Sequence, residues 1–594
     1  MFKDEKTVEI KVCKHCNSNF EITDKDLEFY EKVSPVFSGK KYLIPSPALC
    51  PDCRQQRRLS FFNQTNLYKN TCNNCGKNII SRFNSENGIK NYCNECWSSE
   101  NWDQLKNGKD FDFSKTVFNQ LDYLIKNTPF QNLIGSSSNI INNSIYTNHT
   151  SEIHNSYLVF EANSINDCMY SYALKNSKNI VDSSFVGNSE NCYECSDSYN
   201  MFNSFYCQKS YGSKFSYFLN NCYNCDYCIG CVNLNNKSYY YKNQPISKND
   251  YEKIIKNLAN INYLIIFKRE IYDFFSKNIV KNCNIIGSED CIGNNIINSK
   301  KCINSFDILE CENLKYCVNI NYSKDLYDIT AYGEESNRMY ESLSVGRYSN
   351  NILFSNTVGK GEKLIYCIDV KKSKNCFLCV NLEGKEYCIL NKQYTKEEYE
   401  QLVPKIIEHM QKTGEWGEFF PSSISPFGYN ETVAQEYFPI SHSIKPSSPT
   451  LLSKVEGGLE IPLPLGEVRG GQRTFNRSTY EAPFPKVEKI IKASMLPEDI
   501  SKIPDDILNR AIECEVSGKP FKIIKQELEF YRKHNLPIPK RHPDQRHLDR
   551  MSLRNPRKLF DRKCDKCGKD IKTTYSPDRK EIVYCEECYD KEIY

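Results

Sequence analysis

The sequence predicts a mainly β protein with small α+β zinc modules, in which two right-handed β-solenoid repeats are flanked by treble-clef or zinc-ribbon modules. Two observations predict this class. Paired Cys-x-x-Cys motifs stand near both ends of the chain, and the middle carries a period of about 12 residues marked by asparagine and cysteine. The chain has 594 residues, of which 39% are hydrophobic, so it can bury several cores.

The first unit, residues 1–112, is predicted to be a double zinc module, and its cysteine spacing recurs near the C-terminus. A Cys-x-x-Cys knuckle presents two thiolates from one turn, and a second knuckle completes a tetrahedral site. Redox dithiols are the alternative, but they occur as single pairs beside a βαβ unit. Because a closed four-cysteine site leaves no position for a substrate, we expect three structural zinc ions. The ligand sets are Cys13, Cys16, Cys50 and Cys53; Cys72, Cys75, Cys93 and Cys96; and Cys564, Cys567, Cys585 and Cys588.

The last unit, residues 486–594, reads as a second copy of the first. A shift of 492 places Cys72 on Cys564, and a shift of 501 places residues 27–30 on residues 528–531. Packing is expected to hold the first half of this copy together. We expect no metal there, because only two of the four positions keep a candidate ligand: Cys514, Ser517, His542 and Gln545.

Two solenoid repeats are predicted between the modules, at residues 132–279 and 280–412. An interval of about 12 residues suits one strand and one turn, so two intervals would complete a coil, with asparagine and cysteine stacked at its corners. Each repeat ends in a hairpin and a helix with a capping signal, which would cover the open edge of the solenoid. The asparagines that mark the period are Asn143, Asn155, Asn166, Asn179, Asn191 and Asn203.

One cysteine run in the first repeat allows two interpretations. Its C-x2-C-x2-C-x2-C spacing approaches that of ferredoxins, which would indicate an iron–sulfur cluster or a further zinc and a redox protein. The alternative, which we favour, is a stack of buried thiols, because cysteine behaves as a small buried hydrophobe. The four residues are Cys222, Cys225, Cys228 and Cys231.

The remaining segments are a connector at 113–131 and, at 413–485, an aromatic strap that runs into a Pro/Ser/Gly-rich linker. The N-terminus has no apolar signal segment, and no run of 18 apolar residues exists, so we expect a cytoplasmic protein without a membrane span. The net charge is only +4, so any nucleic-acid surface must be local.

Basic residues gather between the two halves of each zinc module. Arginine suits bidentate contact with phosphate, and a basic helix beside a zinc ribbon is a common nucleic-acid binding element. The alternatives are a solvated helix face, or Arg–acid pairs that dock the two modules together. The candidate contacts are Arg54, Arg57, Arg58, Arg541, Arg546, Arg550, Arg554, Arg557 and Lys558.

The runs CKHCNSNFEITDKDLEFYEK and CPDCRQQRR resemble a zinc-ribbon domain family of bacterial proteins. With GEFFPSSISPFGYNETVAQEYFP and EIVYCEECY, the chain as a whole resembles long zinc-ribbon, treble-clef-like proteins of candidate-phylum bacteria with reduced genomes. The resemblance implies zinc binding and a cytoplasmic location, and it implies no activity.

These observations favour a zinc-binding cytoplasmic scaffold that engages RNA or a ribonucleoprotein through the basic segments of its modules. A protein–protein adaptor that uses the solenoid surface is the first alternative, and a redox protein with a metal centre at Cys222–Cys231 is the second. The acids of the middle region are scattered, so no catalytic constellation indicates an enzyme.

Overall fold

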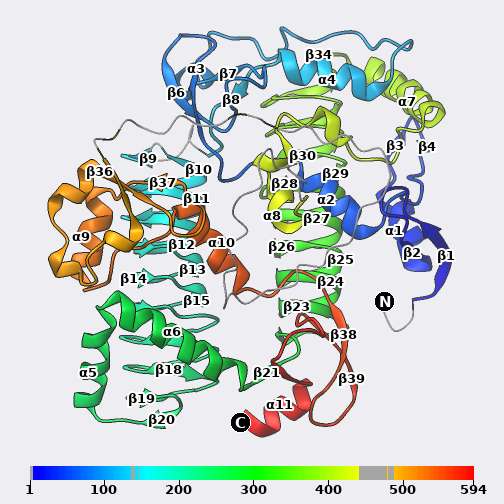
Figure 1. Ribbon diagram of the computed structural model, residues 1–594. Coiled ribbons are helices and arrows are strands. Elements are labelled where there is room, and N and C mark those ends of the chain that lie inside the picture. Colours follow the sequence, from blue (N-terminus) through cyan, green and yellow to red (C-terminus); the bar gives the residue numbers. More distant parts are fainter. Residues whose placement is uncertain are drawn as a thin grey trace, which may run out of the picture.

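The computed structural model describes residues 5–135, 141–144, 146–440, 478, 480, 487 and 489–593. The fold is mainly β, and most strands belong to two long ladders that lie side by side (Figure 1). The linker expected before residue 486 lies almost wholly outside the described residues.

The first ladder pairs each strand in parallel with the chain 12 residues further on, as in Thr147 with Val159. A final antiparallel hairpin ends it. Its strands are β9 (Ile141–Asn142), β10 (Thr147–His154), β11 (Tyr157–Asn166), β12 (Met169–Val181), β13 (Ser184–Gly187), β14 (Glu190–Tyr193), β15 (Ser196–Tyr199), β16 (Phe202–Phe205), β17 (Tyr217–Asn220), β18 (Ile229–Val232), β19 (Tyr240–Tyr241) and β20 (Gln244–Pro245).

The second ladder repeats this plan and also ends in an antiparallel hairpin. Around Ala331 and Tyr332 the coil gains one residue, so Lys324 pairs with Asn337. Its strands are β22 (Ile285–Ile286), β23 (Ile292–Ile297), β24 (Lys300–Leu309), β25 (Glu312–Lys315), β26 (Val318–Asn321), β27 (Lys324–Glu334), β28 (Asn337–Val345), β29 (Asn350–Leu353), β30 (Asn356–Val358), β31 (Glu362–Ile365), β32 (Lys374–Phe377), β33 (Glu386–Ile389) and β34 (Lys392–Gln393).

The backbone turns a corner at every third residue of the ladders, where φ is positive. Asparagine tolerates this left-handed conformation better than most residues, which explains why Asn143, Asn155, Asn179, Asn191 and Asn203 occupy such positions. Four corners three residues apart complete one coil in 12 residues. The expectation that two 12-residue intervals form a coil is therefore wrong: one interval is a full coil.

Four strands of the second ladder close on one another as a small parallel barrel. The two halves of β24 pair with β25 and β26, and both of these pair with β27. The ring closes because β24 and β27 each continue around a corner of the coil.

Small side chains fill the interior of the coils. The hydroxyl of Ser189 accepts a hydrogen bond from the N–H of Met201 in the next coil (3.0 Å) and donates to the carbonyl of Gly187 (2.7 Å). Cys311 does the same with sulfur, since its Sγ accepts from the N–H of Ser323 (3.4 Å) and donates to Leu309 (3.2 Å). Serine and cysteine thus satisfy backbone groups that water cannot reach.

Helices follow each hairpin. In the first ladder Ser247 caps α5 (Lys248–Leu258), which leads into α6 (Ile261–Ser276). In the second, Thr395 forms a capping box on α7 (Lys396–Thr413). Both predicted capping signals are therefore confirmed. The strap after α7 contains η1 (Ser422–Ile424), η2 (Tyr429–Glu431) and α8 (Val433–Tyr437), and Trp416, Phe419 and Phe420 are buried in it.

The N-terminal module begins with a two-stranded sheet and a helix. It continues through a second helix into a ribbon, and α4 then connects it to the first ladder. Its elements are β1 (Thr7–Val12), β2 (Asn19–Thr23), α1 (Asp24–Val33), β3 (Val36–Phe37), β4 (Lys40–Lys41), α2 (Pro51–Leu59), β5 (Tyr68–Thr71), β6 (Asn78–Ser81), β7 (Asn91–Tyr92), α3 (Asn94–Trp97), α4 (Val117–Asn127) and β8 (Phe130–Gln131).

The C-terminal module has the same plan in the same register. Tyr68 pairs with Ser81 in β5–β6, and Phe560 pairs with Thr573 at the equivalent place in β38–β39, 492 positions later. Its elements are β35 (Lys489–Lys492), η3 (Ala493–Met495), η4 (Ile500–Lys502), η5 (Asp505–Asn509), β36 (Arg510–Glu513), β37 (Pro520–Phe521), α9 (Lys525–Lys533), α10 (Pro543–Ser552), β38 (Phe560–Lys563), β39 (Asp570–Thr573), β40 (Ile582–Tyr584) and α11 (Glu586–Ile593).

Candidate metal centres

The structure brings together the four sulfurs of each predicted set. Within each set, all ligand atoms lie within 4.8 Å of one another. Among the described residues these are the groups of three or more metal-ligating side chains that converge in this way. Four thiolates around one point suit zinc and other thiophilic ions.

The three sites share one local construction. The N–H of the first cysteine donates to the carbonyl five residues on, as Cys13 does to Ser18 (2.9 Å) and Cys564 to Lys569 (2.8 Å). This tight turn needs a left-handed residue, which Gly76 supplies in the second site (φ 75°). The second knuckle then opens a helix, as Cys50 does for α2.

Backbone N–H groups favour thiolates in these sites. Burial acts to raise the pKa of Cys72, but hydrogen bonds from Cys75 and Cys93 outweigh it and lower the pKa to about 6. The same balance lowers the pKa of Cys564 to about 6. The thiolate is the metal ligand, so each of the two sites holds one cysteine that ionises readily at neutral pH. Burial raises the pKa of another cysteine in each site, Cys93 and Cys588, to about 12.

The fourth set keeps the fold of a zinc knuckle with fewer ligands. Cys514 donates its N–H to Lys519 (3.0 Å), and Gly518 donates back to Cys514 (3.0 Å), as in the intact sites. His542 caps α10 where Cys50 caps α2. Ser517 and Gln545 supply no thiolate, which is the reason for expecting no metal at this set. That expectation remains a prediction.

The run Cys222–Cys231 forms the inward-facing residues of a single coil. All four thiols are fully buried, and each donates to a backbone carbonyl, as Cys225 Sγ does to Tyr223 (3.3 Å) and Cys228 Sγ to Asp226 (3.3 Å). Burial raises the pKa of Cys222 well above its ordinary value, whereas hydrogen bonds with Cys222 and Cys228 lower the pKa of Cys225 to about 3. This placement matches the interpretation of the run as buried thiols, and the thiols lie in the interior of the coil rather than at its corners.

The basic residues of the N-terminal module face the second ladder. Arg54 contacts Asp328 through Nε (3.0 Å) and Nη2 (2.8 Å), and Arg58 Nη2 lies 3.3 Å from the same carboxylate. Arg57 pairs with Glu341 of the ladder. All three arginines are buried.

The basic residues of the C-terminal module face the first ladder in the same way. Arg546 and Arg550 share Asp182, the latter at 3.0 Å. Arg554 binds Asp197 with both Nε and Nη2 at 2.8 Å. Figure 1 shows α9 and α10 along the first ladder and α1 and α2 along the second.

Phosphate contact through these arginines is therefore unsupported, because their charges are already matched inside the protein. Arg557 pairs with Asp307 (3.2 Å), and the half-exposed Arg541 pairs with Glu515 (2.9 Å) and Asp549 (2.8 Å). Lys558 is exposed. The Arg541 pairs lie within the C-terminal module, and Arg557 reaches the second ladder. The other pairs dock each module onto a ladder, whereas the alternative that the sequence left open had docked the two modules together.

The acidic partners were not predicted as a set. Asp182 and Asp328 occupy left-handed corner positions of the two ladders (φ 49° and 59°) and receive equivalent arginines. The pairing could not be read from the sequence, because nothing in it indicates which module lies against which ladder.

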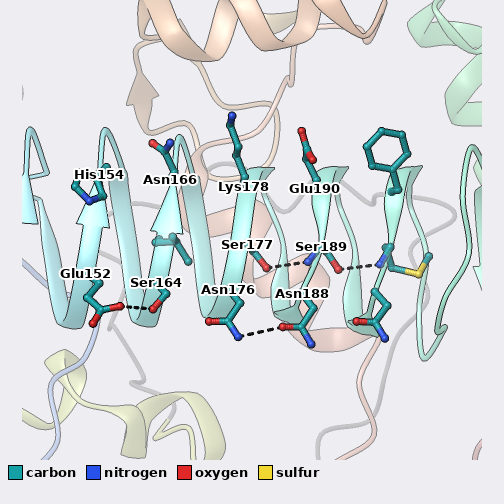
Figure 2. Close-up of a pocket in the computed structure, with 14 residues that line it drawn as sticks. Glu152, His154, Ser164, Asn166, Asn176, Ser177, Lys178, Asn188, Ser189 and Glu190 are labelled. Carbon is teal, nitrogen blue, oxygen red and sulfur yellow. Dashed lines mark hydrogen bonds between the residues drawn. The ribbon is translucent and has the colours of Figure 1, made fainter.

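A polar trough of about 740 Å³ runs along the first ladder. Figure 2 shows Glu152, Ser164, Asn176 and Asn188 along one rim, with His154, Asn166, Lys178 and Glu190 along the other. Rim residues of neighbouring coils bond to each other, as Asn176 Nδ2 does to Asn188 Oδ1 (3.1 Å). The trough presents a repeating row of amide and charged groups to solvent.

Comparisons with known proteins do not assign the chain to a family. No family model and no curated protein matches it. One solved structure that matches, a Desulfovibrio desulfuricans G20 protein described as an acetyltransferase, is 10% identical over 47% of this chain and 83% of that one, with a TM-score of 0.10. Such a likeness carries no structural argument. In the described part of the chain, the helices are too short or too polar to cross a bilayer.

Proposed function

We propose that the protein is a zinc-stabilised scaffold that acts as a protein–protein adaptor, with the two ladders as right-handed β-solenoids. The 12-residue register and the corner at every third residue support the solenoid reading. Four-thiolate sites close around an ion and leave no position for a substrate, which supports a structural role for the metal.

The observation that carries the adaptor role is that the buried arginines of the modules form ion pairs with carboxylates of the ladders. Arg54, Arg58, Arg546 and Arg550 all pair with ladder carboxylates. The basic segments therefore hold the modules in place, and the trough on the first ladder remains as an ordered, solvent-facing surface. Solenoid proteins use such extended faces to bind partners.

The trough is tested by reversing two of its exposed charges. We expect the double variant Lys178→Glu with Glu190→Lys to lose capture of a protein partner from a lysate of the source organism. Capture by the parent chain should survive ribonuclease treatment. The matched control, Lys248→Glu with Glu252→Lys on α5, reverses the same charges on an exposed helix and should behave like the parent. Capture that disappears after ribonuclease treatment would favour the RNA interpretation instead.

The metal is tested by analysis of protein purified without chelators. We expect about three zinc ions per chain, one for each cysteine set. Iron with acid-labile sulfide would contradict a purely structural role and would favour the redox alternative.

A further inference from the structure

The outer edge of β1 is an apolar strand edge without a neighbour in the described part of the chain. β1 pairs with β2 along its other edge only. Val8, Ile10 and Val12 are 57%, 65% and 60% exposed. They alternate along the strand, so they share one face. Proteins usually cover or charge such an edge, because its free N–H and C=O groups can pair with another chain.

The C-terminal module shows how the equivalent edge is covered. β36 corresponds to β1, since Ile512 pairs with Phe521 as Lys11 pairs with Phe20, 501 positions earlier. In that copy β35 adds to the outer edge as a parallel strand, with Ile491 opposite Ile512.

The covering strand changes the exposure of the matched positions. Ala511 lies in β36 and is fully buried, whereas its counterpart in β1, Ile10, is 65% exposed. The segment after β35 adds Leu496, Ile500 and Ile503 to the core of the C-terminal module. The N-terminal module therefore presents an apolar edge in the place where its copy is covered.

The backbone of β1 is set up for the same pairing. Cys13 donates its N–H toward β2, to Ser18 (2.9 Å), as Cys514 does to Lys519 (3.0 Å). Successive N–H groups of a strand point in opposite directions, so the donors of Val12 and Ile10 point to the outer edge.

Charge complementarity indicates the flanks of the occupant. Glu9 and Glu21 are exposed at the β1–β2 sheet, and Glu21 lies opposite Ile10. β35 has the sequence Lys-Ile-Ile-Lys, with a lysine at each end. In the register of β35, the first lysine would lie opposite Glu9 and the second opposite Val12, whereas Glu21 lies on the far side of β1.

We propose that β1 is a docking site for an extended partner segment with consecutive β-branched residues flanked by lysines, which adds as a parallel strand in the manner of β35. Main-chain hydrogen bonds supply affinity in this mode of recognition, and alternate side chains supply specificity. The site is separate from the trough and does not depend on it.

The test uses the full chain and a fluorescent synthetic peptide with the sequence of residues 489–509. We expect saturable binding by anisotropy and slower hydrogen exchange in residues 5–13, with exchange in β36 unchanged. The same peptide with Ile491→Pro should not bind, because proline cannot take part fully in a ladder. Failure of the parent peptide to bind overturns the proposal.

Variants locate the site. Ile10→Lys with Val12→Lys should weaken binding about tenfold or more, because lysine on an edge opposes strand addition and repels the lysine flanks. Val516→Lys is the control, since Val516 is 55% exposed on the other module, and it should leave binding unchanged. The metal content of each variant, compared with that of the parent, shows whether the variant is folded. Unchanged binding in the β1 variant overturns the proposal. Concentration-dependent dimerisation of the parent chain that is lost in the β1 variant also overturns it, because a second copy of the chain would then be the occupant.

Discussion

At the scale of the residue, each ladder is built from tripeptides. One residue turns the corner in the left-handed region, the next points inward, and the third extends the side. Asparagine and glycine suit the corner, while serine and cysteine suit the interior because they are small and bond to the next coil. The cysteine richness of the middle region therefore reflects packing and hydrogen bonding, and the converging metal-ligand sets lie outside that region.

The buried carboxylate of Asp328 provides a first prediction. Arg54 and Arg58, both with nearly inaccessible side chains, depend on it. Asp328→Asn leaves the buried Arg54 without its counter-charge and Arg58 with only Glu341 at 3.7 Å, so we expect a loss of about 3–5 kcal/mol in urea unfolding. The control Glu312→Gln breaks an exposed pair with Lys324 and should cost less than about 1 kcal/mol. Equal losses in the two variants would mean that Asp328 does not anchor the module.

Glu161 provides a pH prediction. Burial raises the pKa of Glu161 to about 8 and lowers the pKa of its neighbour His149 to about 3. The folded protein keeps the Glu161 proton after the unfolded chain has lost it, so this group reduces stability as pH rises from about 4.3 to 8. His149 acts only below about pH 6.5, where it reduces stability as pH falls.

Between pH 6.5 and 8, Glu161 therefore acts without His149. We expect the urea midpoint of the parent to fall over this window, and Glu161→Gln to remove that part of the fall. The exposed control Glu190→Gln should retain the parent's slope. A parent profile that is flat from pH 6.5 to 8 would disprove the assignment.

At the scale of the element, each metal ribbon is tied to the start of a ladder. β40 lies between the two knuckles of the third cysteine set and pairs with β21 (Ile279–Lys281), as β7 of the second set pairs with β8. A metal ion that holds the ribbon therefore also positions the strand that leads into the ladder.

Loss of one ligand should release this link. Cys585→Ser should lower the metal content by about one ion per chain and accelerate hydrogen exchange at residues 279–281, because three thiolates hold zinc less firmly than four. Cys231→Ser, a coil thiol, should leave the metal content unchanged. Metal loss in Cys231→Ser would instead place an ion inside the coil.

At the scale of the whole molecule, two equivalent modules clamp the same pair of ladders. The first half of the N-terminal module docks on the second ladder through Asp328, and its ribbon pairs with the strand before the first ladder. The C-terminal module makes the reciprocal arrangement through Asp182 and β21. Each module therefore bridges both ladders (Figure 1).

Two clamps on one assembly should not act independently. In a double-mutant cycle, Asp182→Asn with Asp328→Asn should destabilise the chain by more than the sum of the single changes, because either remaining clamp still holds the ladders together. We expect a coupling of about 0.5–3 kcal/mol in the urea midpoint. Additivity within about 0.5 kcal/mol would show that the clamps are independent.

The sequence by itself determined the cysteine sets, the duplication of the module and the 12-residue period. Each is a local pattern: the knuckle needs its ligands within one turn, and a repeated coil must repeat its residues. It also indicated that the decayed set around Cys514 would keep its fold by packing, and Phe521, Leu528 and Tyr531 lie buried in one hydrophobic cluster there.

Only the tertiary structure decided the size of the coil and the role of the arginines. The left-handed corner at every third residue is a backbone state that many residue types share here, from Asn179 to Phe185, so composition alone did not reveal it. Arg550 reads as a phosphate-binding residue until Asp182, 368 positions away, lies 3.0 Å from it. The role of a charged side chain depends on the residues that surround it in space. Here those residues depend on which module docks on which ladder.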